Sequence, residues 1–239
     1  MVESQPAGGR LSFVTSATVI ELDALPMRRN FIGLPSRPVG VYDLLVDGVL
    51  TAQATIKGGD AVTIDMATGQ ATHASTPPET LRFDVLPEGE KQIDIWLPHN
   101  ENAWLLELRA NAPVRPVAQQ GRKVWVHYGS SISQGSNAVS PTGTWPAVAS
   151  LRADVGLINL GFGGSALLDP FAARTIRDLA ADFISLKIGI NLVNLDLMRM
   201  RAFGPAVHGF IDTIREGHPT TPLLIVSPIL CPIHEDTPG

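Results

Sequence analysis

The chain has 239 residues, a formal net charge of −5 with neutral histidines, 44% hydrophobic residues and only 17% charged residues. This apolar content excludes a disordered chain, and the mildly acidic balance argues against nucleic-acid binding, which needs an excess of Lys and Arg to neutralise phosphates. The length suits one large domain or two small ones, each with its own core.

Cysteine use and hydropathy together predict a soluble protein of a reducing compartment. Cys231 is the single cysteine, so no internal disulfide is expected. No run approaches the roughly 18 consecutive apolar residues of a membrane span, and the first residues lack the charged-then-apolar pattern of a secretory leader. We therefore expect a cytoplasmic protein that does not bind a membrane, and the sequence leaves its oligomeric state open.

The first part of the chain consists of short alternating runs broken by Gly, Pro and Asp. Asp47-Gly48, between the runs 41–46 and 49–51, predicts a hairpin, because a two-residue turn needs positive φ. Three more runs alternate apolar with polar residues and predict further strands: 81–85, 92–97 and 103–108. Strands at this spacing are typical of a small β-sandwich.

The segment 111–121 has two prolines, a glycine and no clear period, which predicts a linker. We therefore expect a β-sandwich domain over residues 1–112 and a second domain over 121–239. In the second part the chain repeats a strand, turn and helix pattern, which indicates a parallel sheet wrapped by helices. Strands are predicted at 124–128, 157–160, 183–188 and 223–226, with helices over 144–153 and from about 203 to 217.

In an open parallel sheet, ligands bind beyond the carboxyl ends of the strands. Each of the four predicted strands is followed by a loop of small or hydrogen-bonding residues: 129–133, 161–165, 189–191 and 227–229. One such loop alone is more often a turn with a capping serine than a site. Several loops that converge on one edge are a stronger indication.

Three residues in these loops could serve acyl-transfer chemistry. Ser131 follows a strand through a tight glycine-containing turn, which would lift its hydroxyl clear of the sheet near N–H groups that can stabilise an oxyanion. Gly164 stands where a side chain would block a substrate, and its N–H is free to donate. The Asn191 side-chain amide is a third possible donor.

The same loops resemble the sequence blocks of the SGNH (GDSL-type) esterases and acyltransferases. Gly129-Ser130-Ser131-Ile132 is similar to the G-D-S-L/I block, Gly164 matches a block glycine, and Asn191 in K-I-G-I-N matches the G-x-N block. Upstream, G-V-Y-D-L-L (40–45) resembles the G-x-D-L-Y signature of a β-sandwich domain that precedes one branch of this family. The resemblance covers most of the chain and implies a three-layer, parallel-sheet SGNH-hydrolase (flavodoxin-like) α/β domain after the sandwich.

Carried over residue by residue, the resemblance assigns Ser131 as the nucleophile. Its backbone N–H, the Gly164 N–H and the Asn191 side chain would form the oxyanion hole. The implied function is cofactor-free hydrolysis of a small-molecule acyl ester. The first alternative is acyl transfer to a hydroxyl of a small-molecule or sugar acceptor, and the second is a non-catalytic binding module.

The sequence departs from the family at two places. Ser130 replaces the usual Asp, and the D-x-x-H block that supplies the base is absent: none of the six histidines has Asp three residues earlier. Because the family's sheet has five strands and four are predicted here, we expect the last strand and this block to follow Gly239, so that the C-terminal part of the α/β domain is missing. His234 is an alternative base, although a solvated loop position is the favoured interpretation.

Neither a metal nor a phosphate-binding cofactor is indicated. No His, Cys and Asp cluster has ligand spacing, and one cysteine cannot build a structural zinc site. The run G-F-G-G-S (161–165) lacks the G-K-S/T of a P-loop and does not match G-x-G-x-x-G.

Overall fold

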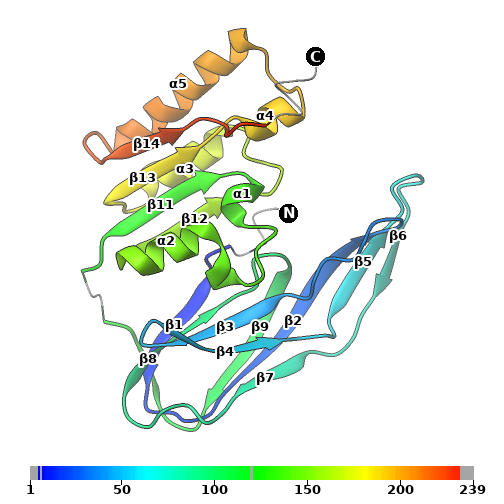
Figure 1. Cartoon of the computed structure of the whole chain (residues 1–239), viewed down its shortest axis with the longest axis vertical. Helices are drawn as coiled ribbons and strands as arrows, with labels where there is room; N and C mark the ends of the chain where they lie inside the picture. The colour runs from blue at the N-terminus through cyan, green and yellow to red at the C-terminus, as the bar shows by residue number, and fades with distance from the viewer. Residues whose placement is uncertain (1–4, 6, 119–120, 232–239) are drawn as a thin grey trace. The chain divides into compact units, whose positions relative to one another are not determined.

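A computed structural model describes residues 5, 7–118 and 121–231, which form two compact units (Figure 1). The first unit holds the described residues up to 118 together with the segment 138–143. The second holds residues 121–137 and 144–231.

The first unit is a β-sandwich. One sheet has the order β10-β1-β8-β3-β4, with antiparallel neighbours throughout. In the other, the long strand β2 pairs in parallel with β5 and antiparallel with β7 and β9, and β6 pairs with β5. The strands are β1 (Arg10–Thr15), β2 (Ile20–Phe31), β3 (Val41–Val46), β4 (Val49–Thr55), β5 (Asp60–Ile64), β6 (Ala71–Ala74), β7 (Glu79–Phe83), β8 (Lys91–Trp96), β9 (Asn102–Ala110) and β10 (Val114–Pro116).

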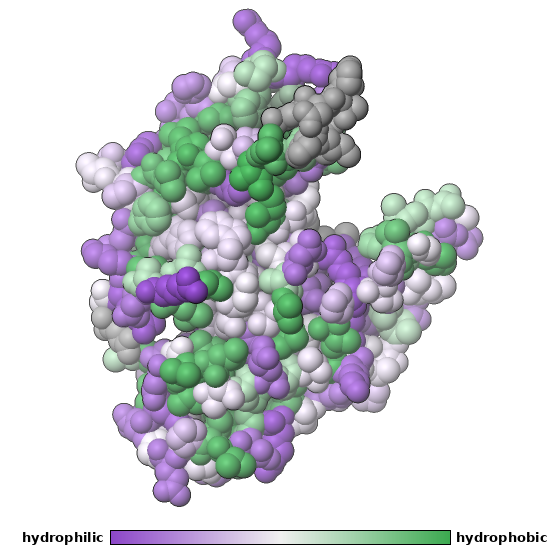
Figure 2. Space-filling model, viewed as in Figure 1, coloured by the Kyte–Doolittle hydropathy of each residue, from purple (hydrophilic) through white to green (hydrophobic). Residues whose placement is uncertain are grey.

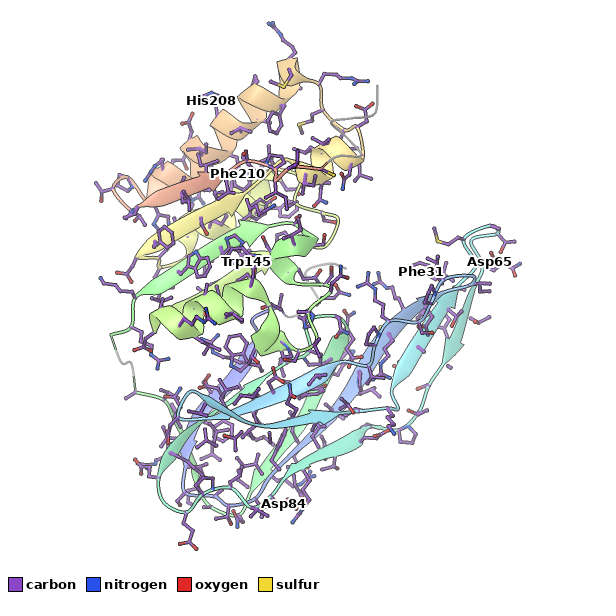
Figure 3. The ribbon with its side chains drawn as sticks, viewed as in Figure 1. Phe31, Asp65, Asp84, Trp145, His208 and Phe210 are labelled. Carbon is purple, nitrogen blue, oxygen red and sulfur yellow. The ribbon has the colours of Figure 1, made fainter. Side chains whose placement is uncertain are left out.

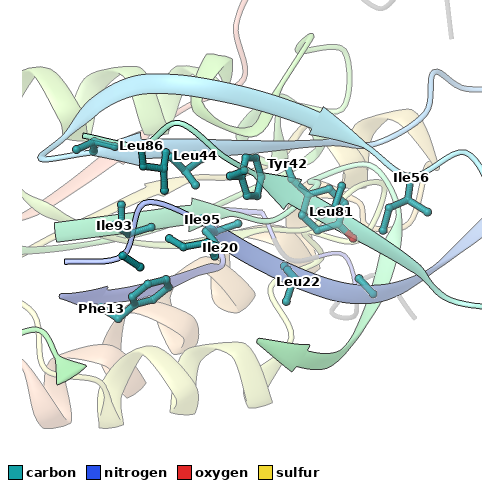
Figure 4. Packing of buried hydrophobic residues seen from close by; sticks show 14 residues of the cluster. Phe13, Ile20, Leu22, Tyr42, Leu44, Ile56, Leu81, Leu86, Ile93 and Ile95 are labelled. Carbon is teal, nitrogen blue, oxygen red and sulfur yellow. The ribbon is translucent and has the colours of Figure 1, made fainter. Parts of the chain in front are cut away.

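Apolar side chains from both sheets fill the space between them (Figure 4). Alternate residues of a strand point to opposite faces, so each strand contributes every second side chain to this core. One sheet supplies Phe13, Leu44, Ile93 and Ile95, and the other supplies Ile20, Leu22, Leu81 and Phe83, all buried. Full burial of a side chain of this size contributes about 1.5–3 kcal/mol, so this core carries the stability of the first unit.

Two turn and edge features of the first unit bear on the sequence predictions. Asp47 and Gly48 have φ of 49° and 80° between β3 and β4, which confirms the predicted hairpin. Within the predicted linker, Val114–Pro116 forms the strand β10 and pairs with β1, which the sequence did not predict. Proline is tolerated there because an edge strand needs ladder hydrogen bonds on one side only.

A buried carboxylate organises the segment 138–143 within the first unit. Asp43 on β3 is fully buried and accepts hydrogen bonds from Thr142 N and Oγ1 at 2.9 and 2.6 Å. Gln53, its neighbour on β4, donates to the other carboxylate oxygen at 2.7 Å. Asp43 is the acidic residue of the G-V-Y-D-L-L motif, so the motif residue holds this segment in place.

The second unit is built on a parallel sheet of order β12-β11-β13-β14, as the alternating pattern predicted. Its strands are β11 (Val124–Gly129), β12 (Gly156–Gly161), β13 (Phe183–Lys187) and β14 (Leu223–Val226), and its helices are α1 (Ser131–Gln134), α2 (Trp145–Ala153), α3 (Pro170–Asp178), α4 (Ile190–Asn194) and α5 (Met200–Gly217). The 3₁₀ turn η1 (Pro141–Gly143) belongs to the first unit. No helix within the described ranges is both long and apolar enough to cross a lipid bilayer.

Helices cover the two faces of this sheet unequally. α3 and α5 pack on one face, where Phe210 and Ile214 join a buried apolar cluster with residues of β11 and β13. On the opposite face Trp145 of α2 contacts Trp125 and His127 of β11. Figure 3 labels Trp145 and Phe210, which come from these two helix layers.

The α2 face is less completely covered than the other. Phe183 and Leu224, at the β13 and β14 side of this face, are 36% and 52% exposed. Figure 2 shows apolar side chains at the surface where Figure 1 places these strands.

Candidate active site

The sheet order places three of the predicted loops at one edge. β11 lies between β12 and β13, and the chain first steps to one side of β11 and then to the other. This reversal creates a switch point at the carboxyl ends of β11 and β13, where open α/β sheets bind ligands. α1 follows β11 at this point, and α4 follows β13.

Ser131 is the first residue of α1 and is partly exposed. The preceding Ser130 is extended, with φ −83° and ψ −161°, and its carbonyl accepts from Ser133 N and Gln134 N at 2.9 Å each. Within the described part of the chain, the Ser131 N–H finds no hydrogen-bond acceptor. The turn thus leaves both the Ser131 hydroxyl and its N–H available to a ligand.

α1 lies directly on the end of β12. A Cβ on Gly161 would collide with Gln134 N and the Ser133 carbonyl carbon, so only glycine permits this approach. Asn159 Nδ2 donates to Ser133 O at 3.0 Å, and Phe162 N donates to Gly129 O at 2.7 Å. These contacts join the loop that carries Ser131 to the loop after β12.

Gly164 is exposed in the turn after β12, with φ +74°. A Cβ there would meet nothing within 4 Å. The positive φ is a reason for glycine at this position. The expectation that a side chain here would block a substrate stays a prediction. Its N–H donates no hydrogen bond to any other described residue.

Asn191 on α4 is 6% exposed, and its amide has a fixed orientation. Oδ1 accepts from Ala166 N at 3.1 Å, two residues beyond Gly164. Because the oxygen is held in this way, the two Nδ2 hydrogens face away from Ala166 as possible donors. This bond joins the loop after β13 to the loop after β12.

The three predicted residues thus lie on loops that contact one another in series. α1 packs on the β12 end, and the turn after β12 is bonded to Asn191. The catalytic roles of Ser131, Gly164 and Asn191 stay predictions.

No described histidine is hydrogen-bonded to Ser131. His127 is bonded to two buried serines, His218 Nε2 contacts Ile176 O at 3.0 Å, and His208 lies exposed on α5. The alternative base His234 lies outside the described residues. Among the residues that the structure places, no group of three or more His, Cys, Asp or Glu side chains could hold a metal ion.

His127, in the strand before Ser131, forms a polar network that the sequence did not predict. His127 is 1% exposed, and burial lowers its pKa to about 4, helped by the positive charge of Lys187. Its Nδ1 lies 2.7 Å from Ser185 Oγ and its Nε2 lies 2.8 Å from Ser133 Oγ. The one feature of the sequence that could have indicated this network is the two-residue period of β11 and β13, which puts His127 and Ser185 on the same face of the sheet.

Two further polar groups near this edge are buried without a partner among the described residues. Lys187 ends β13, and burial lowers the pKa of its amine. The Ser130 hydroxyl, at the position where the resembled family has Asp, also lacks a partner. Each costs about 1–3 kcal/mol if left unsatisfied, so both mark this edge as more than a packing surface.

Comparison with known proteins identifies the family of the second unit. Residues 122–231 match the GDSL-like Lipase/Acylhydrolase family. Residues 122–231 therefore belong to the GDSL-like lipase/acylhydrolase family. The resemblance read from the sequence blocks is confirmed, together with the α/β fold class.

Solved structures extend the similarity over nearly the whole chain. A salicylyl-acyltransferase, SsfX3, from a tetracycline biosynthetic pathway is 30% identical with a TM-score of 0.83, covering 98% of this chain and 62% of that one. A Bacteroides ovatus protein described as a GDSL-like lipase is 25% identical with a TM-score of 0.69, covering 94% and 62%. A family two carbohydrate esterase from Clostridium thermocellum shares the fold at 11% identity, with a TM-score of 0.65 and coverage of 94% and 72%.

The chain spans 62% of the length of each of the first two proteins. No curated protein matches it.

Proposed function

We propose that this chain carries the nucleophile and oxyanion donors of a serine-dependent acyl-ester hydrolase. The observation that carries the proposal is the series of contacts from α1 through the β12 turn to Asn191. These contacts join the three loops that carry a partly exposed hydroxyl and three N–H groups with no acceptor among the described residues.

The chemistry follows from the donors. Ser131 Oγ attacks the ester carbonyl carbon while its proton passes to a base outside the described residues. The carbonyl π electrons move to oxygen, where the N–H groups of Ser131 and Gly164 and the Asn191 amide stabilise the negative charge. The carbon–oxygen bond to the alcohol then breaks, and the alcohol leaves with a proton. Water attacks the acyl-enzyme, which releases the acid and restores Ser131.

A second candidate is transfer of the same acyl group to an acceptor hydroxyl. It is favoured by one observation, the 30% identity over 98% of this chain to a protein described as a salicylyl-acyltransferase. Water and an alcohol compete for one acyl-enzyme, so the two candidates share every residue named above. An acceptor of the carbohydrate or natural-product class fits this second candidate.

The test is turnover of p-nitrophenyl acetate by the natural gene product and by Ser131→Ala. The proposal predicts product release that falls by several orders of magnitude in the variant, with an unchanged far-UV circular dichroism spectrum. Addition of a sugar or polyketide alcohol then separates the candidates, since acyl transfer yields a new ester and hydrolysis yields only acetate. Wild-type turnover that survives in Ser131→Ala would overturn both. No turnover together with measurable glycan binding would favour a non-catalytic binding module.

A further inference from the structure

Beneath α1 lies a buried polar network that the proposed chemistry does not use. His127 stands on β11 two residues before the strand ends, and its imidazole spans from Ser185 on β13 to Ser133 on α1. Ser185 Oγ also accepts from Trp125 Nε1 at 2.7 Å. All four side chains are at least nine-tenths buried, so each hydrogen bond here is made away from competing water.

The imidazole has little freedom to move. The ring centroid of Trp145 lies 4.8 Å away, edge to face, and that of Trp125 lies 5.3 Å away. The ring therefore packs against two aromatic side chains, and its two nitrogens meet the hydroxyls of Ser185 and Ser133. A neutral imidazole has one donor and one acceptor nitrogen, which suits two hydroxyl partners in either tautomer.

The Ser133 end of the network bears directly on the nucleophile. Ser133 lies two residues after Ser131 in the short helix α1, and its backbone carbonyl is held by Asn159. The bond from His127 fixes its side chain as well. Four residues with few internal hydrogen bonds cannot hold a helical turn rigid alone, so external contacts set where Ser131 points.

We propose that His127 is a positioning residue, which holds Ser133 and thereby fixes the Ser131 hydroxyl and N–H for acyl transfer. This inference rests on the proposed function of Ser131. It assigns no proton transfer to His127, because its nitrogens are occupied and buried.

The geometry allows a matched pair of substitutions. Gln places its terminal amide near the position of the imidazole Nε2 and can still reach Ser133, whereas Asn reaches only the Nδ1 position and Ser185. His127→Gln should therefore keep most of the wild-type rate and His127→Asn should lose it. Ser133→Ala removes the same bond without disturbing the aromatic rings, and Ser185→Ala removes only the remote bond.

The measurement is the rate of Ser131 modification by a fluorophosphonate probe, separated into its maximal rate and its half-saturating concentration. Small misplacement of a nucleophile costs on the order of 100-fold, so His127→Asn and Ser133→Ala should lose about that much in maximal rate with unchanged half-saturation. His127→Gln and Ser185→Ala should stay near wild type. Hydrogen exchange at the α1 amides should accelerate in the two slow variants only.

The pH profile gives a readout that simple packing would not. Lys187 from β13 is the charged group that acts on His127, and its other neighbours are the uncharged residues Trp125, Trp145, Ser133 and Ser185. Protonation of His127 removes its acceptor nitrogen, so the serine hydroxyl that donates to this nitrogen must turn away. The wild-type rate should therefore fall as the pH drops through about 4. His127→Gln should lack this acid limb.

Three results would overturn the inference. These are a wild-type rate in Ser133→Ala, equal losses in the Gln and Asn variants, or an acid limb that persists in His127→Gln. Because Ser133→Ala changes one hydroxyl only, it decides the matter if His127→Asn does not fold. Failure of the wild-type protein to react at Ser131 would instead contradict the proposed function itself.

Discussion

The two faces of the parallel sheet use the same strands for different purposes. On the face covered by α3 and α5, Val126, Tyr128, Ile184 and Leu186 are fully buried in a continuous apolar cluster. On the α2 face, the alternate residues of β11 and β13 include His127, Ser185 and Lys187, which are polar and buried. One face stabilises the fold, and the other places polar groups beneath the candidate active site.

This contrast shows that one strand can contribute both to stability and to a functional site, because its side chains alternate between the two faces of the sheet. Each apolar residue on one face is followed by a residue free to take another role on the other. Two of the polar residues lie near the carboxyl edge of the sheet, beside the candidate site: His127 contacts α1, and Lys187 is the last residue of its strand.

Asn191→Asp should have the largest effect, which is on kcat. It tests whether the carboxyl edge of the sheet supplies an oxyanion donor. Asp keeps an oxygen that can accept from Ala166 N but loses the Nδ2 donor. Loss of one oxyanion donor costs about 100- to 1000-fold in turnover, and we expect this in kcat with little change in KM. Steady-state ester hydrolysis measures it.

Asn191→Ala is the control, because it loses the acceptor as well. It should show a similar fall in kcat and an additional loss of about 1 kcal/mol in the free energy of unfolding. Wild-type kcat in Asn191→Asp would remove Asn191 from the oxyanion hole.

Ile184→Ala tests the apolar face. Ile184 is fully buried, so truncation should lower the free energy of unfolding by about 2–5 kcal/mol, measured by urea titration. Leu224→Ala, on the other face and 52% exposed, is the matched control and should change it by less than about 0.5 kcal/mol. Comparable losses from the two variants would mean that both faces are equally packed and would cancel the contrast.

Lys187→Met should have the smallest effect on the free energy of unfolding, and it should stabilise the protein, whereas most substitutions destabilise it. The Lys187 ammonium is buried without a described partner, so replacing it with Met should raise the free energy of unfolding at pH 7 by about 1–3 kcal/mol. Because burial lowers the pKa of Lys187 in the folded state, the unfolded chain binds more protons below the ordinary pKa of 10.5. Wild-type stability should therefore rise toward the variant's as the pH approaches 10.5.

Urea titrations of both proteins at pH 7 and pH 10 check this prediction. A variant that is less stable than wild type at pH 7 would show that Lys187 has a partner that stabilises it.

Local signals made much of the fold predictable from the sequence. Asp47-Gly48 specifies its own turn, and the apolar runs of β11 to β14 fix a parallel sheet whose carboxyl ends must share an edge. Convergence of the loops of Ser131, Gly164 and Asn191 follows from that topology. β10 escaped prediction because Pro113 and Pro116 are typical of a linker, and only pairing with β1 makes Val114–Pro116 a strand.

The network beneath α1 was not predictable, for a physical reason. A histidine in an apolar strand has the same local sequence whether it only packs against apolar neighbours or makes hydrogen bonds to another segment. What distinguishes His127 is the register that sets it opposite Ser185 and the close approach of α1 over Gly161. Both depend on contacts between segments far apart in the chain.

The most direct test of the account is to trap the acyl-enzyme. The protein is mixed with p-nitrophenyl acetate, quenched in acid within the first turnover, digested and mapped by mass spectrometry. The account predicts an acetyl group on the peptide that contains Ser131, absent from Ser131→Ala and restored to free enzyme over time. Acetylation confined to other residues, during turnover that Ser131→Ala does not slow, would contradict it.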